Sequence, residues 1–493
     1  NEALIVTGIK IASFTYGVLL ALFILIKMNK KFSNFSLFSG MVLGLSSVFL
    51  CSNYSVAWTL LILIGFSVNI FVVFFIYFLE KKISKIGRYI VFFLILQIIS
   101  IFFIFNYLGA KPANYGLDIF IREGLHLIEN KNVAVLANRS SVNKDGNNIV
   151  DILNNQKDIQ LIKIFSPEHG FKSNLSAGEN VTNSNYNNID IISLYGSNKK
   201  PSLDDLANID VIIIDIQDIG STYYTYLSTV TYVLEAAAEN NITVIVLDRP
   251  NPIGRNIYGP IKKKLNFIGL HPIPIRHGMT IGELCYMIND EGWLGNGVKV
   301  KNLQIVKMNE FPDSNEYHHW IAPSPNIPDI KTAFIYNGTC LFEGTNISEG
   351  RGTEKPFKYI GAPWINSNHL MGYINALKNN KYGSKIEIKK IEFTPKSNEG
   401  AKNPKYEGEI CYGISIDLDK SIEPIEFSIY LLQYFYNNYK EFSFNEDFFD
   451  ILYDGSSDLR ECFKNNCNME KILNDINKDK IEFNQFREKY LFY

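Results

Sequence analysis

Long apolar runs dominate the first part of the chain. They approach the ~20 residues that a helix needs to cross a bilayer, and they are Ala3 to Ile26, Phe35 to Cys51, Val56 to Leu79 and Tyr89 to Leu108. Helices of a water-soluble core would carry a polar face at helical spacing, and Leu61 to Phe78 carries none. The pattern therefore predicts a transmembrane region of about four α-helices over residues 1–112.

Basic residues predict how this region is oriented. They gather after the first run and between the third and the fourth: Lys27, Lys30, Lys31, Lys81, Lys82, Lys85 and Arg88. Basic loops stay on the cytoplasmic side, so we expect a multi-pass protein of the cell membrane whose chain after Lys111 is extracytoplasmic. Because Asn1 is not a Met, further helices before it remain an open alternative.

From Asn132 onward, short β-branched runs alternate with helical patterns. The predicted strands are Val133–Leu136, Gln160–Phe165, Ile189–Ser193, Val211–Ile214 and Thr243–Leu247. The predicted helices are Asn148–Leu153, Leu203–Ala207 and Ser228–Asn240. Such alternation is typical of βαβ units. We therefore expect a Rossmann-like α/β domain with a parallel sheet over residues 113–300.

The alternation stops beyond about Gly295, where loops rich in Pro and Gly follow. Strands are predicted again at Ile386–Phe393 and Ile410–Ile416, and a helix at Ile425–Tyr439. Residues 301–493 are therefore expected to form a second, auxiliary α/β domain that completes the cleft.

Composition narrows the possible functions. The formal net charge of -2 over 493 residues gives no electrostatic reason to expect a nucleic-acid partner. A glycine-rich dinucleotide fingerprint after the first strand and a Walker-type phosphate loop are both missing from the sequence. We therefore expect no cofactor.

The cysteines do not indicate a disulfide framework. The chain has six of them, and none shows paired metal-ligand spacing. Cys462 and Cys467 are near enough in sequence to pair, but we expect free buried thiols instead.

Polar segments follow the predicted strands directly. They are Asn138-Arg139-Ser140-Ser141, Ser166-Pro167-Glu168-His169-Gly170, Asp215-Ile216-Gln217-Asp218 and Asp248-Arg249-Pro250-Asn251-Pro252. Ligands of parallel α/β sheets bind beyond the carboxyl ends of the strands. We expect these segments to meet on one rim.

Glu168 and His169 place a carboxylate beside an imidazole on a tight turn, and either group is suited to proton transfer. The alternative is a structural turn in which Glu168 caps a helix and His169 bonds a backbone carbonyl. Glycoside hydrolysis usually needs two carboxyl groups. The candidates in loop contexts are Glu168, Glu179, Asp215, Asp218, Asp248 and Glu343. Because Asp248 is next to Arg249, an orienting ion pair between them is favoured over a catalytic role for Asp248.

Other side chains suit substrate recognition. Tyr223 and Tyr224 belong to an aromatic cluster that either stacks on sugar faces or packs in the core. Arginine holds carboxylates with two parallel hydrogen bonds, and the candidates for this role are Arg139, Arg276 and Arg351.

A loop entering a helix follows at Arg276-His277-Gly278-Met279-Thr280. Thr280 is expected to cap this helix, with Glu283 completing a capping box. A metal site built from His169, His277 and nearby acids is not favoured, because the sequence offers no close His pair.

Several motifs stand in the order known from one family. They are Ser166-Pro167-Glu168-His169-Gly170, Ala177-Gly178-Glu179, Asp215-Ile216-Gln217-Asp218-Ile219-Gly220, Asp248-Arg249-Pro250-Asn251-Pro252, Arg276-His277-Gly278-Met279-Thr280, Pro323-Ser324-Pro325-Asn326, Glu343-Gly344-Thr345-Asn346 and Arg487-Glu488-Lys489-Tyr490. From about Tyr115 to Tyr493, the chain thereby resembles the NamZ-type exo-β-N-acetylmuramidases, a glycoside hydrolase family formerly filed as a domain of unknown function.

The resemblance implies a hydrolase that releases N-acetylmuramic acid from the non-reducing end of peptidoglycan fragments. It also implies a Rossmann-like domain with an auxiliary C-terminal domain, and Glu168 as the catalytic residue. The sequence departs from the family at Arg139-Ser140-Ser141, where His, Thr and Gly are usual, and at Tyr258, where an acidic residue is common. These departures bear on sugar specificity.

Together, these inferences assign Glu168 as general acid, with His169 beside it. Asp215, Asp218 or Glu343 would supply the second carboxylate, unless the N-acetyl group of the substrate acts as the nucleophile. The residues expected to bind the muramyl glycan are Asn138, Arg139, Gln217, Tyr223, Tyr224, Asp248, Arg249, Arg276, His277, Asn326, Asn346 and Arg351. The alternatives are a membrane-attached muropeptide sensor without catalysis and a metal-dependent amidase or esterase.

Overall fold

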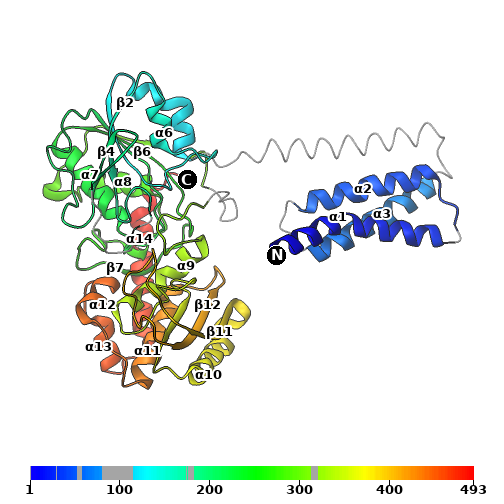
Figure 1. Ribbon diagram of the computed structural model, residues 1–493. Helices are drawn as coiled ribbons and strands as arrows, with labels where there is room; N and C mark the ends of the chain where they lie inside the picture. Colours follow the sequence, from blue (N-terminus) through cyan, green and yellow to red (C-terminus); the bar gives the residue numbers. More distant parts are fainter. Residues whose placement is uncertain are drawn as a thin grey trace. The chain divides into compact units, whose positions relative to one another are not determined.

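The computed structural model describes residues 2–28, 30–52, 58–79, 115–173, 175, 183–311 and 320–493. The chain divides into two compact units, Asn1–Pro112 and Ala113–Tyr493 (Figure 1). The predicted helix over Tyr89–Leu108, the basic segment before it and the motif containing Glu179 lie outside the described residues.

The described part of the first unit consists of helices that pack side by side: α1 (Glu2–Lys27), α2 (Asn34–Ser52) and α3 (Trp58–Leu79) (Figure 1). The helices approach closely at glycines, and a Cβ added at Gly17 would overlap the carbonyl of Ile62. Asn69 is buried here and donates from its side-chain amide to the carbonyl of Val18 at 3.2 Å. Judged over its described residues alone, no helix is long and apolar enough to span a membrane.

The described part of the second unit contains a seven-stranded sheet with the order β3-β4-β2-β1-β5-β6-β9. Its parallel strands are β4 (Ile189–Ser193), β2 (Gln160–Ser166), β1 (Asn132–Leu136), β5 (Val211–Ile214), β6 (Thr243–Leu247) and β9 (Leu303–Val306). The edge strand β3 (Ser184–Tyr186) is antiparallel. The parallel-sheet prediction is confirmed. β9 lies beyond residue 300, so the first domain extends past the boundary expected from the sequence.

Helices cover both faces of this sheet because side chains alternate along each strand. Val133 and Val135 pack on α6 (Ile149–Asn154). Ala134 and Leu136 face the larger core that includes α7 (Tyr226–Glu239) and α8 (Ile281–Asp290). The strands are therefore apolar on both faces, as parallel strands between helical layers require.

The predicted helix at Leu203–Ala207 is wrong, because this segment forms successive turns. The backbone N–H and side-chain hydroxyl of Ser202 both donate to the Asp205 carboxylate, and the Asp205 N–H donates back to that hydroxyl. These reciprocal bonds are those of a capping box, but the backbone bonds that follow run from Leu206 to Leu203 and from Ala207 to Asp204, and Asn208 then adopts a left-handed φ of 60° that ends the turns.

A second sheet follows, and its strands are antiparallel in the order β10 (Tyr359–Ala362), β12 (Cys411–Leu418) and β11 (Ile386–Phe393). The two strands and the helix predicted here are confirmed, the helix as α11 (Pro424–Asn438). The other helices are α9 (Ile330–Thr339), α10 (Ser367–Leu377), α12 (Glu446–Tyr453), α13 (Asp458–Lys464) and α14 (Met469–Arg487).

The two sheets share one continuous hydrophobic core. The long helix α14 runs back from the second sheet toward the first, and it packs on the short hairpin of β7 (Tyr258–Ile261) and β8 (Pro274–Arg276) (Figure 1). The auxiliary domain is thus joined to the first domain by packing as well as by the chain.

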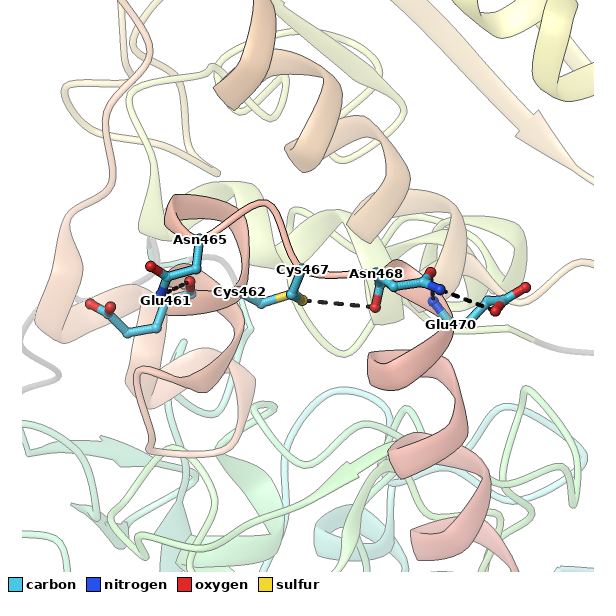
Figure 2. The surroundings of a disulfide bond; sticks show 6 residues. All are labelled: Glu461, Cys462, Asn465, Cys467, Asn468 and Glu470. Atoms are coloured by element: carbon cyan, nitrogen blue, oxygen red, sulfur yellow. Dashed lines mark hydrogen bonds between the residues drawn. A yellow bond between two sulfur atoms is a disulfide. The ribbon is translucent and has the colours of Figure 1, made fainter.

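Cys462 and Cys467 form a disulfide, so the expectation of free thiols is wrong for this pair (Figure 2). Cys462 lies in the last turn of α13, and Asn466 then adopts a left-handed φ of 49° that turns the chain back. The Cα atoms of the two cysteines come within 4.9 Å, inside the range that a disulfide needs. Cys285, Cys340 and Cys411 are free and buried, as predicted.

The double variant C462S/C467S is expected to unfold more easily than the wild type. The disulfide joins residues with a sequence separation of 5. Constraining so short a loop in the unfolded chain stabilises the fold by roughly 2 kcal/mol. Urea unfolding with and without dithiothreitol measures the effect. Reductant should lower wild-type stability to that of the variant and leave the variant unchanged, and a variant as stable as the oxidised wild type would contradict the assignment.

Candidate active site

Glu168 and His169 form a tight turn directly after β2. The turn is closed by the N–H of Gly170, which donates to the carbonyl of Pro167 at 3.0 Å, and His169 adopts a left-handed φ of 70°. A non-glycine residue rarely adopts this conformation, and it occurs most often where the surrounding structure enforces it. The turn therefore holds the two side chains in fixed directions beyond the end of the strand.

Both side chains are almost fully buried. The Thr225 hydroxyl donates to Glu168 Oε2 at 2.6 Å, and Thr225 directly precedes α7. His169 Nδ1 lies 2.7 Å from the carbonyl oxygen of Leu175. Burial lowers the pKa of His169, against the opposing charge of Glu168. The imidazole is therefore held in its neutral form, with its Nδ1–H directed at the carbonyl of Leu175.

Glu168 and His169 line a cavity of about 800 Å³. Of the other candidates from the sequence, it is also lined by Tyr223, Tyr224, Asn326, Glu343 and Arg351. Loops of the first domain and of the auxiliary domain therefore contribute side chains to one cavity. A volume of this size is typical of sites for small molecules.

The auxiliary domain contributes a charged cluster to the cavity. Arg351 donates to Glu343 Oε1 from Nε at 2.8 Å and from Nη2 at 2.6 Å, and it lies 3.8 Å from Glu349. Lys405 pairs with Glu349 at 3.0 Å and also donates to nearby backbone carbonyls. Burial raises the pKa of Glu343, and Arg351 opposes the shift. The cluster thus places a carboxyl and a guanidinium on the cavity wall.

Asp215 does not line this cavity and instead forms a buried ion pair. Arg249 donates to its two carboxylate oxygens, from Nε at 2.5 Å and from Nη2 at 2.9 Å, and both side chains are almost inaccessible. The Ser141 hydroxyl donates to the backbone carbonyl of Asp215 at 2.5 Å. Arg249 also donates to the carbonyl of Val142. The segments after β1, β5 and β6 therefore do meet, but the residues that pair there are not among those that line the cavity.

The expected ion pair between Asp248 and Arg249 is wrong, because the guanidinium turns to Asp215. Asp248 accepts hydrogen bonds from Thr280, from the N–H of Gly282 and from the hydroxyl of Tyr493. Asp248 thus ties the first domain to the last residue of the chain. The capping box of Thr280 and Glu283 at the start of α8 is confirmed.

The fold's stability should depend on pH through Asp248. Burial raises its pKa to about 7 from 3.8, despite the donors around it. The folded protein therefore keeps a proton that the unfolded chain releases, and stability falls as pH rises from about 4 to about 7, by up to ~1.4 kcal/mol per pH unit. Urea unfolding across this window should show a flatter pH profile for D248N. Identical profiles for the two proteins would contradict this.

Four more predicted residues are buried and are not among the residues that line the cavity: Gln217, Asp218, Arg276 and His277. Asp218 lies 3.5 Å from His277 Nε2. Arg276 pairs with Glu423 at 3.0 Å. Arg276 and His277 thus join the end of the β7–β8 hairpin to neighbouring segments, whereas Gln217 donates to the carbonyls of Asp218 and Pro250.

The three predicted asparagines and Arg139 have different positions. Asn138 is buried and donates to the Tyr226 hydroxyl. Asn326 lines the cavity and donates to the carbonyl of Gly400. The Asn346 side chain forms hydrogen bonds with the backbone of the segment before α12. Arg139 is exposed. Neither residue is among those that line the cavity.

The sequence left some contributors unidentified. Thr225, Glu349 and Lys405 are among them, and Thr225 and Lys405 contact partners that are distant in sequence, namely Glu168 and Glu349. Glu349 could have been noticed in the glycine-rich segment beside Arg351, because a buried arginine needs acidic partners. Thr225 and Lys405 gave no comparable signal.

Comparison with known proteins shows to which family this chain belongs. Residues 133–331 match the family model described as exo-beta-N-acetylmuramidase NamZ, N-terminal, and residues 334–493 match its C-terminal counterpart. The chain belongs to the NamZ family. The NamZ models divide the chain within α9, beyond the boundary near residue 300 expected from the sequence.

Named relatives agree with this membership. Peptidoglycan beta-N-acetylmuramidase NamZ of Bacillus subtilis is 36% identical over 403 residues, which are 79% of this chain and 93% of that protein. A crystal structure of a DUF1343 family protein from Bacteroides fragilis has a TM-score of 0.68 at 29% identity, covering 78% of this chain and 99% of its own. A second crystal structure of a DUF1343 family protein from the same organism has a TM-score of 0.63 at 31% identity, covering 77% of this chain and 99% of its own. The NamZ resemblance of the sequence motifs is thereby confirmed.

Proposed function

We propose that this chain is an exo-acting glycosidase that releases N-acetylmuramic acid from the non-reducing end of peptidoglycan fragments. Membership of the exo-β-N-acetylmuramidase family supports the reaction. The observation that carries the assignment to a site is the single cavity that collects Glu168, His169, Glu343 and Arg351. Its carboxyl groups suit glycosidic bond cleavage, and its guanidinium suits an acidic sugar.

Glu168 is the proposed general acid. Its carboxyl group lies at the cavity wall and is almost fully buried. The bond from Thr225 fixes one oxygen of the carboxyl group. In the reaction, Glu168 would give its proton to the glycosidic oxygen as the bond to the anomeric carbon breaks.

Glu343 is the proposed second carboxylate. Asp215 and Asp218 are buried and are not among the residues that line the cavity, whereas Glu343 is. Burial raises the pKa of Glu343, whereas Arg351 opposes this shift and favours the ionised form, which activates water or stabilises positive charge at the anomeric carbon. If the substrate's N-acetyl group is the nucleophile instead, E343Q should keep most of its activity.

A chromogenic N-acetylmuramide tests the proposed function. Wild-type protein should release N-acetylmuramic acid from it, and should act poorly on the matching N-acetylglucosaminide, which lacks the lactyl carboxylate. Binding of muropeptides without turnover would favour the sensor, and loss of activity with a chelator would favour a metal-dependent hydrolase.

We further propose that the first unit anchors the enzyme in the cell membrane with the catalytic domain outside the cytoplasm. In a water-soluble bundle the polar side chains face the solvent, but in this unit polar Ser36, Ser39 and Asn69 are buried. Its exposed side chains are large and apolar, and they include Leu19, Phe23, Ile26, Leu63, Phe71 and Phe78. Lipid tails accommodate such a surface, and close glycine contacts are typical of helices packed in membranes. The disulfide supports an oxidising compartment.

Protease treatment of intact cells tests this orientation. External protease should digest residues after Lys111 while a membrane-embedded fragment survives. A catalytic domain that is untouched until the cells are lysed, or a full-length protein in the soluble fraction, would contradict the proposal.

A further inference from the structure

The cavity extends to side chains that bond cleavage does not use. Tyr195 and Lys199 follow β4, and Phe267 lies in the connection between β7 and β8. The Phe267 ring centroid lies 6.2 Å from that of Tyr195 and 4.4 Å from the Lys199 ammonium nitrogen. An aromatic surface and a cation therefore lie together on one part of the cavity wall.

Burial decreases from the carboxylates toward this cluster. Glu168 is 8% exposed and Tyr223 is 3% exposed, whereas the ring of Phe267 is half-buried and its neighbour Leu265 is 47% exposed. The cavity thus runs from an enclosed end at Glu168 to the surface near Phe267. In an exo-acting enzyme, the enclosed end fits a terminal sugar, and the rest of the glycan must leave by a path to the surface.

The segment that carries Phe267 is held firmly in place. Lys262 is 2% exposed and donates to the carbonyl oxygens of Ile451 at 2.8 Å and Leu452 at 2.6 Å. Gly269 has a φ of 130°, and a Cβ there would lie 2.8 Å from Lys262 Cε. Packing against an anchored side chain fixes the loop, and a fixed ring loses little entropy when it binds a sugar.

Lys199 differs in charge environment from the lysine beside it. Lys200 pairs with Glu235 and Glu239, but no ion pair of Lys199 occurs in the part of the chain that the structure describes. Its ammonium lies over the Phe267 ring, a weak interaction that an anionic ligand can replace. Lys199 is therefore suited to bind a carboxylate.

The cavity also reaches exposed residues at Lys402 and Asn403. This edge comes from the segment 400–405, which contributes no aromatic ring to the lining. A pyranose presents an apolar C–H face that packs well on an aromatic ring. The edge at Phe267 is therefore the better path for a glycan.

We propose that Tyr195, Phe267 and Lys199 form a leaving-group subsite, which binds sugars on the reducing-end side of the scissile bond. The proposal rests on the function proposed above. Phe267 and Tyr195 pack against an N-acetylhexosamine. Lys199 pairs with the carboxylate of a muramyl residue or its peptide. In a glycan that alternates N-acetylmuramic acid and N-acetylglucosamine, the first leaving sugar has no carboxylate and the second has one.

Three substrates test the aromatic part of this subsite: a chromogenic N-acetylmuramide, the disaccharide MurNAc-GlcNAc and the tetrasaccharide of two such units. For F267A, the ratio of kcat/KM for the tetrasaccharide to that for the chromogenic substrate should fall roughly tenfold. The matched control is L265A, on the same loop but outside the cavity lining, and it should keep the wild-type ratio.

The same substrates separate the role of Lys199. K199M should lower the ratio of kcat/KM for the tetrasaccharide to that for the disaccharide by roughly two- to fivefold. K199R should restore the ratio, and added salt should shrink the difference because the pair is partly solvated.

The outcomes distinguish this inference from the proposed function. If wild-type protein cleaves none of the substrates, the proposed function fails and the subsite fails with it. If it cleaves all of them and both variants leave every ratio at the wild-type value, the function stands and the leaving-group subsite is wrong.

Discussion

The variant E168Q is expected to lower kcat for a chromogenic N-acetylmuramide by roughly 10³-fold, because the amide cannot donate the proton that a carboxylic acid supplies to the leaving oxygen. The fold should be unaffected. Gln has the same shape as Glu, and its carbonyl oxygen can still accept the Thr225 hydrogen bond now made to Oε2.

The size of this loss separates catalysis from structure. Steady-state kinetics and urea unfolding of the same preparations measure both quantities. The exposed carboxylate of Glu409 provides a matched control, and E409Q should keep wild-type kinetics. An E168Q protein that is folded and retains activity within a few-fold of wild type would remove Glu168 from the mechanism.

The variant R249M is expected to destabilise the fold by about 3–5 kcal/mol, because it leaves the carboxylate of Asp215 buried without its partner. The two side chains are 2% and 0% exposed, so water cannot replace the lost guanidinium. Burial already raises the pKa of Asp215, and Arg249 is the main group that opposes this shift. The effect should appear as a lower urea midpoint.

A surface ion pair provides the control for this variant. Lys331 and Asp417 lie 2.6 Å apart with 55% and 43% of their side chains exposed. K331M should change the free energy of unfolding by about 1 kcal/mol or less. If R249M is as stable as K331M but loses activity, Asp215 and Arg249 act in catalysis and our structural interpretation is wrong.

The strands of the first sheet could be predicted from the sequence because each has a recognisable local pattern of residues. Runs such as Val211–Ile214 are β-branched, apolar on both faces and bounded by polar turns. The turn of Glu168 and His169 was also predictable, since it follows such a run directly. What local patterns cannot predict is how far a sheet extends, and β9 joins it after a long intervening segment.

The interaction partners of the polar side chains were less predictable. Asp248 and Arg249 are neighbours in sequence, but successive side chains at the end of a strand point in opposite directions. Arg249 therefore meets Asp215, which directly follows the adjacent strand β5, and Asp248 meets Tyr493 from the other end of the chain. Such partners are determined by the order of the strands in the sheet, which local sequence patterns do not predict.

The central claim is that the cavity around Glu168 removes one terminal muramyl sugar at a time. Product analysis by mass spectrometry, after brief digestion of the tetrasaccharide MurNAc-GlcNAc-MurNAc-GlcNAc by wild type and by E168Q, tests it most directly. We expect free N-acetylmuramic acid and the complementary trisaccharide as the first wild-type products, and neither from E168Q. Disaccharide products from internal cleavage, or equal products from both proteins, would contradict the account.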